Sequence, residues 1–122
     1  MSHYHAVVWI DHHRATVWQF SPNAQEHTAV RSHSRHARHA TQDDRPFFEE
    51  VAGALAGAHE ILILGPAQAK HALSAYLHER HPALGAGIIA VENADHPSDG
   101  QILDYARRHF RALDRMVPPT PR

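Results

Sequence analysis

The sequence of 122 residues contains no cysteine, and this absence excludes disulfide bonds, thiol catalysis and cysteine-ligated zinc or iron–sulfur sites. It also lacks any apolar run near the ~18 residues that span a bilayer, and its first residues show no signal-peptide pattern. We therefore expect a cytoplasmic protein without a membrane segment. Lysine is nearly absent as well, since Lys70 is the single lysine beside eleven arginines.

The composition favours one folded domain. Hydrophobic residues make up 43% and charged residues 20% of the chain, which suits one core and argues against wholesale disorder. Fourteen histidines accompany a formal net charge of −1, and their full protonation would raise that charge by 14, to +13. Because histidine titrates near pH ~6.5, mild acidification would change this surface strongly. A histidine-rich module that oligomerises in response to pH is therefore one hypothesis.

The first third of the chain has the pattern of a three-stranded meander. Residues 5–10 and 14–20 are apolar runs rich in β-branched and aromatic side chains, separated by a short polar turn. This pattern predicts a hairpin. A third strand is predicted from Glu26 to about Ser32, with Thr28 and Val30 on one side.

Helices and buried strands alternate after the meander. The apolar runs 61–64 and 88–91 predict two more strands. Helical spacing and capping residues predict three helices, at 44–57, 66–80 and from Ser98 onwards. In the first of these, Asp44 is the expected N-cap and Gly57 the expected stop. The order β-β-β-α-β-α-β-α predicts an α/β fold, a mixed five-stranded sheet with helices on both faces. We expect one domain over residues 1–115 and a disordered proline-rich tail over 116–122.

A basic loop rich in histidine and arginine is predicted over residues 31–43, which contain almost nothing to bury. Arginine forks match phosphate geometry, and each neutralised phosphate releases counterions, so this loop favours RNA contact. The alternative is a solvated connector. The arginines that we assign to RNA contact are Arg31, Arg35, Arg38 and Arg45.

Lys70 joins this set because of its position in the segment 65–70, where a Gly-Pro turn follows a buried strand and opens a helix. Free backbone N–H groups at a helix start, with a lysine nearby, make a candidate anion site. The spacing is not that of a Walker A loop, and the alternative is an ordinary strand-to-helix turn.

Metal binding is a further hypothesis. His33, His36 and His39 repeat every three residues, and neutral imidazoles ligate zinc, nickel or copper, although this spacing matches no closed site. We expect no cofactor apart from a divalent metal at these histidines. Asp11 and His12 follow the first strand and, together with carboxylates near Asp95, would suit a metal-dependent hydrolase or nuclease. The carboxylates considered are Glu49, Glu50, Glu92, Asp95 and Asp99. Otherwise, Asp11 simply closes the hairpin.

Four segments together resemble a known family: 5–12, 47–52, 60–70 and 91–101. They are similar to small bacterial proteins of the translational machinery component superfamily, which resemble the middle domain of archaeal and eukaryotic peptide release factors and of Pelota. The resemblance runs from about His5 to Phe110 and implies a ribonuclease H-like layout. It also implies that the loop after the third strand lies where the family touches ribosomal RNA.

One departure from the family changes the expected activity. Release factors carry a Gly-Gly-Gln tripeptide in this loop, whereas residues 31–42 contain no glycine and Gln42 follows Ala40 and Thr41. The resemblance therefore implies a non-catalytic, ribosome- or RNA-associated protein linked to translation. Its expected partner is the ribosome or ribosomal RNA, with neither membrane binding nor DNA sequence specificity, and a homo-oligomer remains open.

Overall fold

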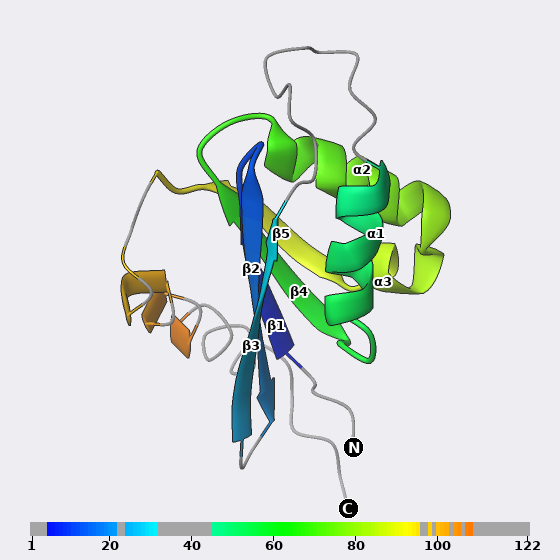
Figure 1. The fold of residues 1–122 in the computed structure, drawn as a ribbon. Coiled ribbons are helices and arrows are strands. Elements are labelled where there is room, and N and C mark those ends of the chain that lie inside the picture. The colour runs from blue at the N-terminus through cyan, green and yellow to red at the C-terminus, as the bar shows by residue number, and fades with distance from the viewer. Residues whose placement is uncertain are drawn as a thin grey trace, which may run out of the picture.

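One mixed sheet with helices on both faces makes up the described part of the protein (Figure 1). The computed structural model describes residues 5–21, 24–31, 45–95, 98, 100–102, 104–105 and 107–108. The strands are β1 (His5–Ile10), β2 (Arg14–Ser21), β3 (Ala24–Arg31), β4 (Glu60–Gly65) and β5 (Ile88–Asn93). The helices are α1 (Arg45–Ala54), α2 (Ala69–Arg80) and α3 (Pro82–Ala86). Residues 100–102, 104–105 and 107–108 are also helical and are called the C-terminal helical residues below.

The sheet has the strand order β3-β2-β1-β4-β5. β1 and β2 form the predicted antiparallel hairpin, with Ile10 opposite Ala15, and β3 pairs antiparallel with β2. β4 and β5 add in parallel on the other side of β1, as their continuous apolar runs suggested. The predicted mixed five-stranded α/β sheet is therefore confirmed.

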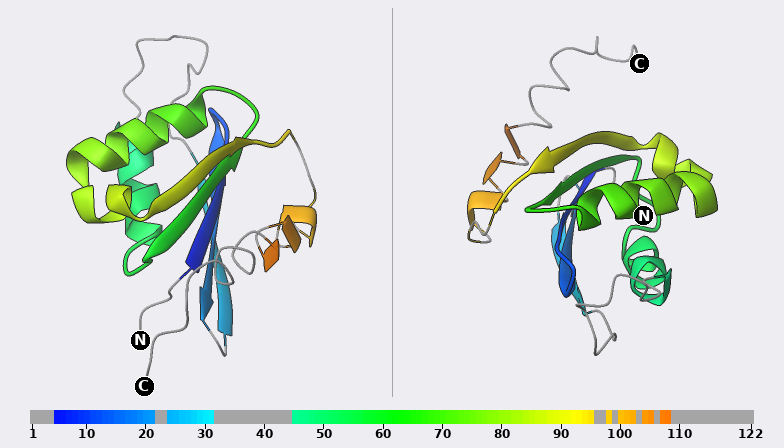
Figure 2. Two further views of the ribbon diagram at one scale, coloured as in Figure 1. Left: turned by 180° about the vertical axis from the view of Figure 1, so that it is seen from behind. Right: turned by 90° about the horizontal axis from the view of Figure 1, so that it is seen from above.

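Two apolar layers hold the sheet, one on each face. The larger layer joins alternate residues of the strands to the buried faces of α1 and α2, with Val8, Ile63, Val51 and Leu73 fully buried. On the opposite face, Trp9 and its neighbours pack against Ile102 of the C-terminal helical residues. Figure 2 shows the C-terminal helical residues, in orange, and the α1–α2 pair on opposite sides of the sheet.

Some element bounds differ from those predicted. α2 begins at Ala69 rather than at Pro66, because residues 66–68 form the turn that leaves β4. The short helix α3 was not predicted, since its five residues are too few to show helical periodicity. It packs closely on α2: a Cβ at Gly85 would lie 2.8 Å from the Cα of His78. Gly57, the predicted stop of the first helix, has a φ of 88°, a left-handed value that favours glycine.

Several predictions concern residues outside the described part of the chain. These are the capping role of Asp44, most of the basic loop over 31–43 and the tail over 116–122. None of the helices that the structure describes is long and apolar enough to cross a membrane.

Candidate functional site

The candidate site lies at one edge of the sheet, where β1, β4 and β5 end. Because β2 runs antiparallel to these strands, β2 begins and the hairpin closes at the same edge; β3 runs antiparallel to β2 and therefore also ends there. Open α/β sheets bind ligands outside the carboxyl ends of their parallel strands. We call this region the carboxyl edge; it comprises the turn 11–13, the ends of β3, β4 and β5, and the turn 66–68.

Two arginines face each other at this edge. Arg14 begins β2 and Arg31 ends β3, and the register places them directly opposite one another. Both are exposed, and like charges at directly opposed positions destabilise a sheet. The Arg14 guanidinium carbon lies 5.6 Å from the centroid of the Trp9 ring. An anion between two guanidinium groups offsets such like-charge repulsion.

Arg14 was not predicted from the sequence, whereas Arg31 and Arg45 were. The missing signal is the hairpin register, which follows from the length of the turn between β2 and β3. Arg45 is exposed at the start of α1, on the other side of the segment 32–44. Arg35 and Arg38, together with the three predicted metal ligands His33, His36 and His39, lie outside the described residues.

Asp11 closes the hairpin. Its Oδ1 accepts hydrogen bonds from the backbone N–H groups of His13, at 2.8 Å, and Arg14, at 2.9 Å. Asp11 and His12 also border a hollow of about 70 Å³ beside Phe47 and the start of α2. The carboxylate thus fixes the turn through which the chain passes from β1 to β2.

The predicted carboxylates are held at different places. Glu49 on α1 accepts a hydrogen bond from Tyr76, and its Oε1 lies 2.8 Å from Nε2 of His81. These two bonds, led by that to His81, hold the pKa of Glu49 below its usual value. Glu92 is bonded instead to Tyr105. Within the described ranges, no group of three or more histidine, aspartate and glutamate side chains is placed to hold a metal ion.

Lys70 is buried, with 6% of its surface exposed. Its Nζ donates to the backbone carbonyl of Ala67 and to Oδ1 of Asn93, the latter at 3.2 Å. The ammonium thus ties the turn after β4 to the end of β5. This position favours a role in holding the edge together, and direct contact between Lys70 and RNA stays a prediction.

Close backbone packing continues this part of the edge. A Cβ at Gly65 would lie 2.2 Å from the carbonyl oxygen of Ile10, so the ends of β1 and β4 need glycine at this position. The N–H of Ala94 donates to the carbonyl of Gly65 at 2.9 Å. The Trp9 indole Nε1 donates to the carbonyls of Ala94 and Asp95, at 3.3 and 3.1 Å. The three parallel strands are therefore bonded together where they end.

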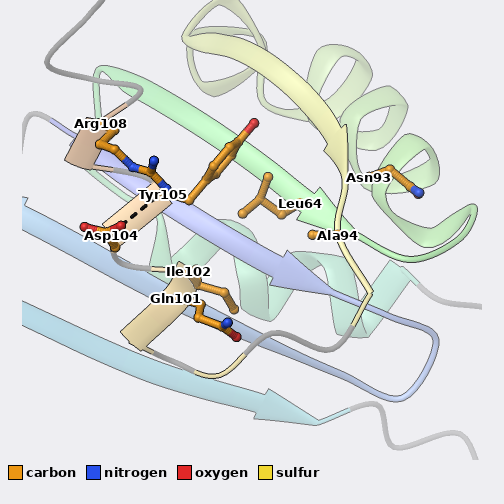
Figure 3. Close-up of a pocket in the computed structure, with 8 residues that line it drawn as sticks. All are labelled: Leu64, Asn93, Ala94, Gln101, Ile102, Asp104, Tyr105 and Arg108. Carbon is orange, nitrogen blue, oxygen red and sulfur yellow. Dashed lines mark ion pairs between the residues drawn. The ribbon is translucent and has the colours of Figure 1, made fainter.

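A cavity of about 490 Å³ opens beside these strand ends (Figure 3). Leu64 lines it from β4 and Ala94 from just beyond the end of β5, while Ile102 and Tyr105 line it from the C-terminal helical residues. The Tyr105 hydroxyl donates to Glu92, and this bond raises the pKa of the phenol above its usual value. Tyr105 was not predicted from the sequence. Its one signal was an aromatic residue between Asp104 and the pair Arg107 and Arg108.

Comparisons with known proteins give a match in structure alone. No model of a known family matches the chain, and no curated protein does so either. Pelota from Thermoplasma acidophilum matches 85% of the chain with 20% identity and a TM-score of 0.63, and Pelota from Archaeoglobus fulgidus matches 88% with 18% identity and a TM-score of 0.64. The archaeal translation termination factor aRF1 matches 92% with 14% identity and a TM-score of 0.59.

The chain spans only part of these proteins: 32% of each Pelota chain and 38% of the termination factor. At such low identities the match shows the fold. The resemblance predicted from the sequence is confirmed at this level, since the chain has the fold of about one third of a Pelota or archaeal termination-factor chain, as a middle-domain-like protein would.

Proposed function

We propose that this protein associates with the ribosome or with RNA in translation and is not itself a catalyst. The fold that it shares with Pelota and an archaeal termination factor supports a role in translation. The sequence supports the non-catalytic part, because residues 31–42 contain no glycine and so no Gly-Gly-Gln tripeptide. A catalyst of peptidyl-tRNA hydrolysis that works as release factors do would need that tripeptide.

The observation that carries the proposal is the opposed pair of Arg14 and Arg31 at the carboxyl edge. Arg31 is also the residue from which the chain enters the segment 32–44, which brings Arg35 and Arg38 in sequence. RNA phosphates would bridge the guanidinium groups and remove their repulsion. Arg45, at the far end of that segment, adds to the same basic region.

Two finer points belong to the proposal. The strand order β3-β2-β1-β4-β5, with helices on both faces, supports a ribonuclease H-like layout. A partner in translation, together with the absence of cysteine from the sequence, supports a location in the cytoplasm.

The test is sedimentation of the protein with ribosomes over a range of salt concentrations. We expect co-sedimentation at low salt that is lost at high salt, because phosphate contacts release counterions. The single variants R14Q and R31Q should each lose about one phosphate contact. The slope of log affinity against log salt concentration should then become less steep by about 0.7 to 0.9. The double variant R35E/R38E should abolish binding.

Arg80→Gln is the matched control, because Arg80 is exposed in the last turn of α2, away from the carboxyl edge. This variant should retain the slope of the unaltered protein. Binding that does not respond to salt, or that is weakened equally by R14Q and R80Q, would contradict the proposed contact. A protein that stays at the top of the gradient under every condition would reject ribosome association itself.

A further inference from the structure

The cavity beside the C-terminal helical residues has a floor suited to a flat apolar ring. Leu64 at the end of β4 is 1% exposed and Ile102 is 3% exposed, and both line the cavity together with Ala94. The volume of about 490 Å³ falls within the ~300–1,000 Å³ typical of small-molecule sites. Asn93 also borders the cavity, but its side chain points toward Lys70 and away from Tyr105 (Figure 3).

Tyr105 forms the aromatic wall of this cavity. Among the described residues it is the large hydrophobic side chain that stands out at the surface, with 37% of its area exposed. Its hydroxyl is bonded to Glu92 on β5, which holds the ring in place across the space between helix and sheet. A ring held in this way loses little conformational freedom when a ligand stacks on it.

The mouth of the cavity carries a guanidinium group that can exchange its partner. Nη2 of Arg108 lies 3.3 Å from Oδ2 of Asp104, in a pair spaced i, i+4 along the helix. The two side chains are 69% and 67% exposed. Exposed pairs of this kind are weak because water screens the attraction, whereas a phosphate offers a guanidinium two charge-assisted hydrogen bonds. A ligand phosphate would therefore compete well for Arg108.

From this arrangement we propose that the cavity takes one nucleotide, with its base between Tyr105 and the apolar floor and its phosphate at Arg108. Stacking tolerates different bases because each base has a π-face. The nucleotide belongs either to an RNA strand or to a free mononucleotide. The first source rests on the proposed function, since the RNA would be the one bound at the carboxyl edge, whereas the second does not depend on it.

The first experiment titrates the ¹⁵N-labelled full chain with AMP, adenosine and inorganic phosphate and follows the NMR signals. The indole N–H of Trp9 is the reporter, because it donates to the carbonyl of Ala94 in the cavity lining; the chain has two tryptophans, so two indole signals are expected. AMP should shift the Trp9 signal and the amide signal of Ile102. Adenosine should do so more weakly, and phosphate alone should bind weakest.

Three variants separate the two halves of the site. Tyr105→Leu keeps an apolar side chain but removes the aromatic face, and should weaken AMP and adenosine alike by about tenfold or more. Arg108→Gln should weaken AMP by about tenfold and leave adenosine within about twofold. Arg80→Gln, which changes an exposed arginine on another helix, should leave both unchanged.

The outcomes are decisive. Absence of AMP binding at millimolar concentration, or AMP binding that Tyr105→Leu leaves intact, would overturn the inference. Binding with the expected variant pattern supports it, and ribosome sedimentation of Tyr105→Leu then identifies the source. Weakened sedimentation indicates a nucleotide of RNA, and unchanged sedimentation indicates a free nucleotide. If the unaltered protein binds AMP but never sediments with ribosomes, the proposed function fails while the nucleotide site stands.

Discussion

Replacing Lys70 by methionine separates two roles for the single lysine of the chain. If Lys70 holds the carboxyl edge together, as its burial and its bonds to Ala67 and Asn93 indicate, the loss appears as reduced stability. If Lys70 instead contacts RNA, the loss appears in the salt dependence of binding. The two readouts are independent, so one variant distinguishes the roles.

The expected loss of stability follows from the contacts. Lys70→Met removes two hydrogen bonds that the buried ammonium donates, one to Ala67 and one to Asn93, both of them exposed residues. Each hydrogen bond to a charged group contributes about 1.5–3 kcal/mol. Burial of the methionine side chain in place of an ammonium returns about 1.5–3 kcal/mol. We expect a net destabilisation of about 2 kcal/mol, which is a large part of the ~5–15 kcal/mol by which domains are stable.

Urea unfolding measures this change. With a slope near ~2 kcal/mol per molar urea, a loss of about 2 kcal/mol moves the midpoint down by about 1 M. Lys70→Arg sharpens the test: the larger guanidinium should also destabilise a buried site, whereas it would preserve an exposed phosphate contact. The structural role would be refuted if Lys70→Met kept the stability of the unaltered protein to within about 0.5 kcal/mol and flattened the salt dependence of RNA binding.

Three further substitutions test the strand ends and helix α1. Gly65→Ala should destabilise by about 2 kcal/mol or more, because its Cβ would meet the carbonyl oxygen of Ile10, a backbone atom of the central strand. Gly53→Ala in α1, where a Cβ meets nothing within 4 Å, should stabilise the protein by about 0.5–1 kcal/mol. A G65A variant that is more stable than G53A in urea unfolding would contradict the close contact between Gly65 and Ile10. Glu49 has a lowered pKa, so its bonds to Tyr76 and His81 contribute fully above its usual pKa of 4.5 and are lost as the pH falls through the lowered value. The stability gap between the unaltered protein and E49Q should therefore close between about pH 5 and pH 2, and a gap that persists at the acid end would contradict it.

The sequence was sufficient for the sheet and for most of the helices. Apolar runs rich in β-branched and aromatic residues place β1 and β2, and an unbroken apolar run places β4 between other strands. The spacing of Phe47, Phe48, Val51 and Ala52 identified the buried face of α1. These signals are local, because each depends on which neighbours along the chain are apolar.

The features of the candidate site are not local, which is why most of them escaped prediction. Whether Lys70 is exposed depends on Asn93, which lies 23 residues further along the chain. That Arg14 faces Arg31 depends on the register of two strands, and a slip by one residue would move the arginines apart. A single sequence carries neither relation in its periodicity.

Trp9 connects the arginine pair at the carboxyl edge with the cavity beside it. One face of its indole lies near the guanidinium of Arg14, while its N–H holds the carbonyl of Ala94, which lines the cavity. A nucleic-acid strand with one phosphate between Arg14 and Arg31 and one base beside Tyr105 would therefore pass the same tryptophan. Because this indole is bonded within the sheet, the distance between the arginine pair and the cavity is fixed by β1, β4 and β5. Such a fixed spacing would let the edge select an extended single strand over a duplex, whose bases are stacked and not free to enter a cavity.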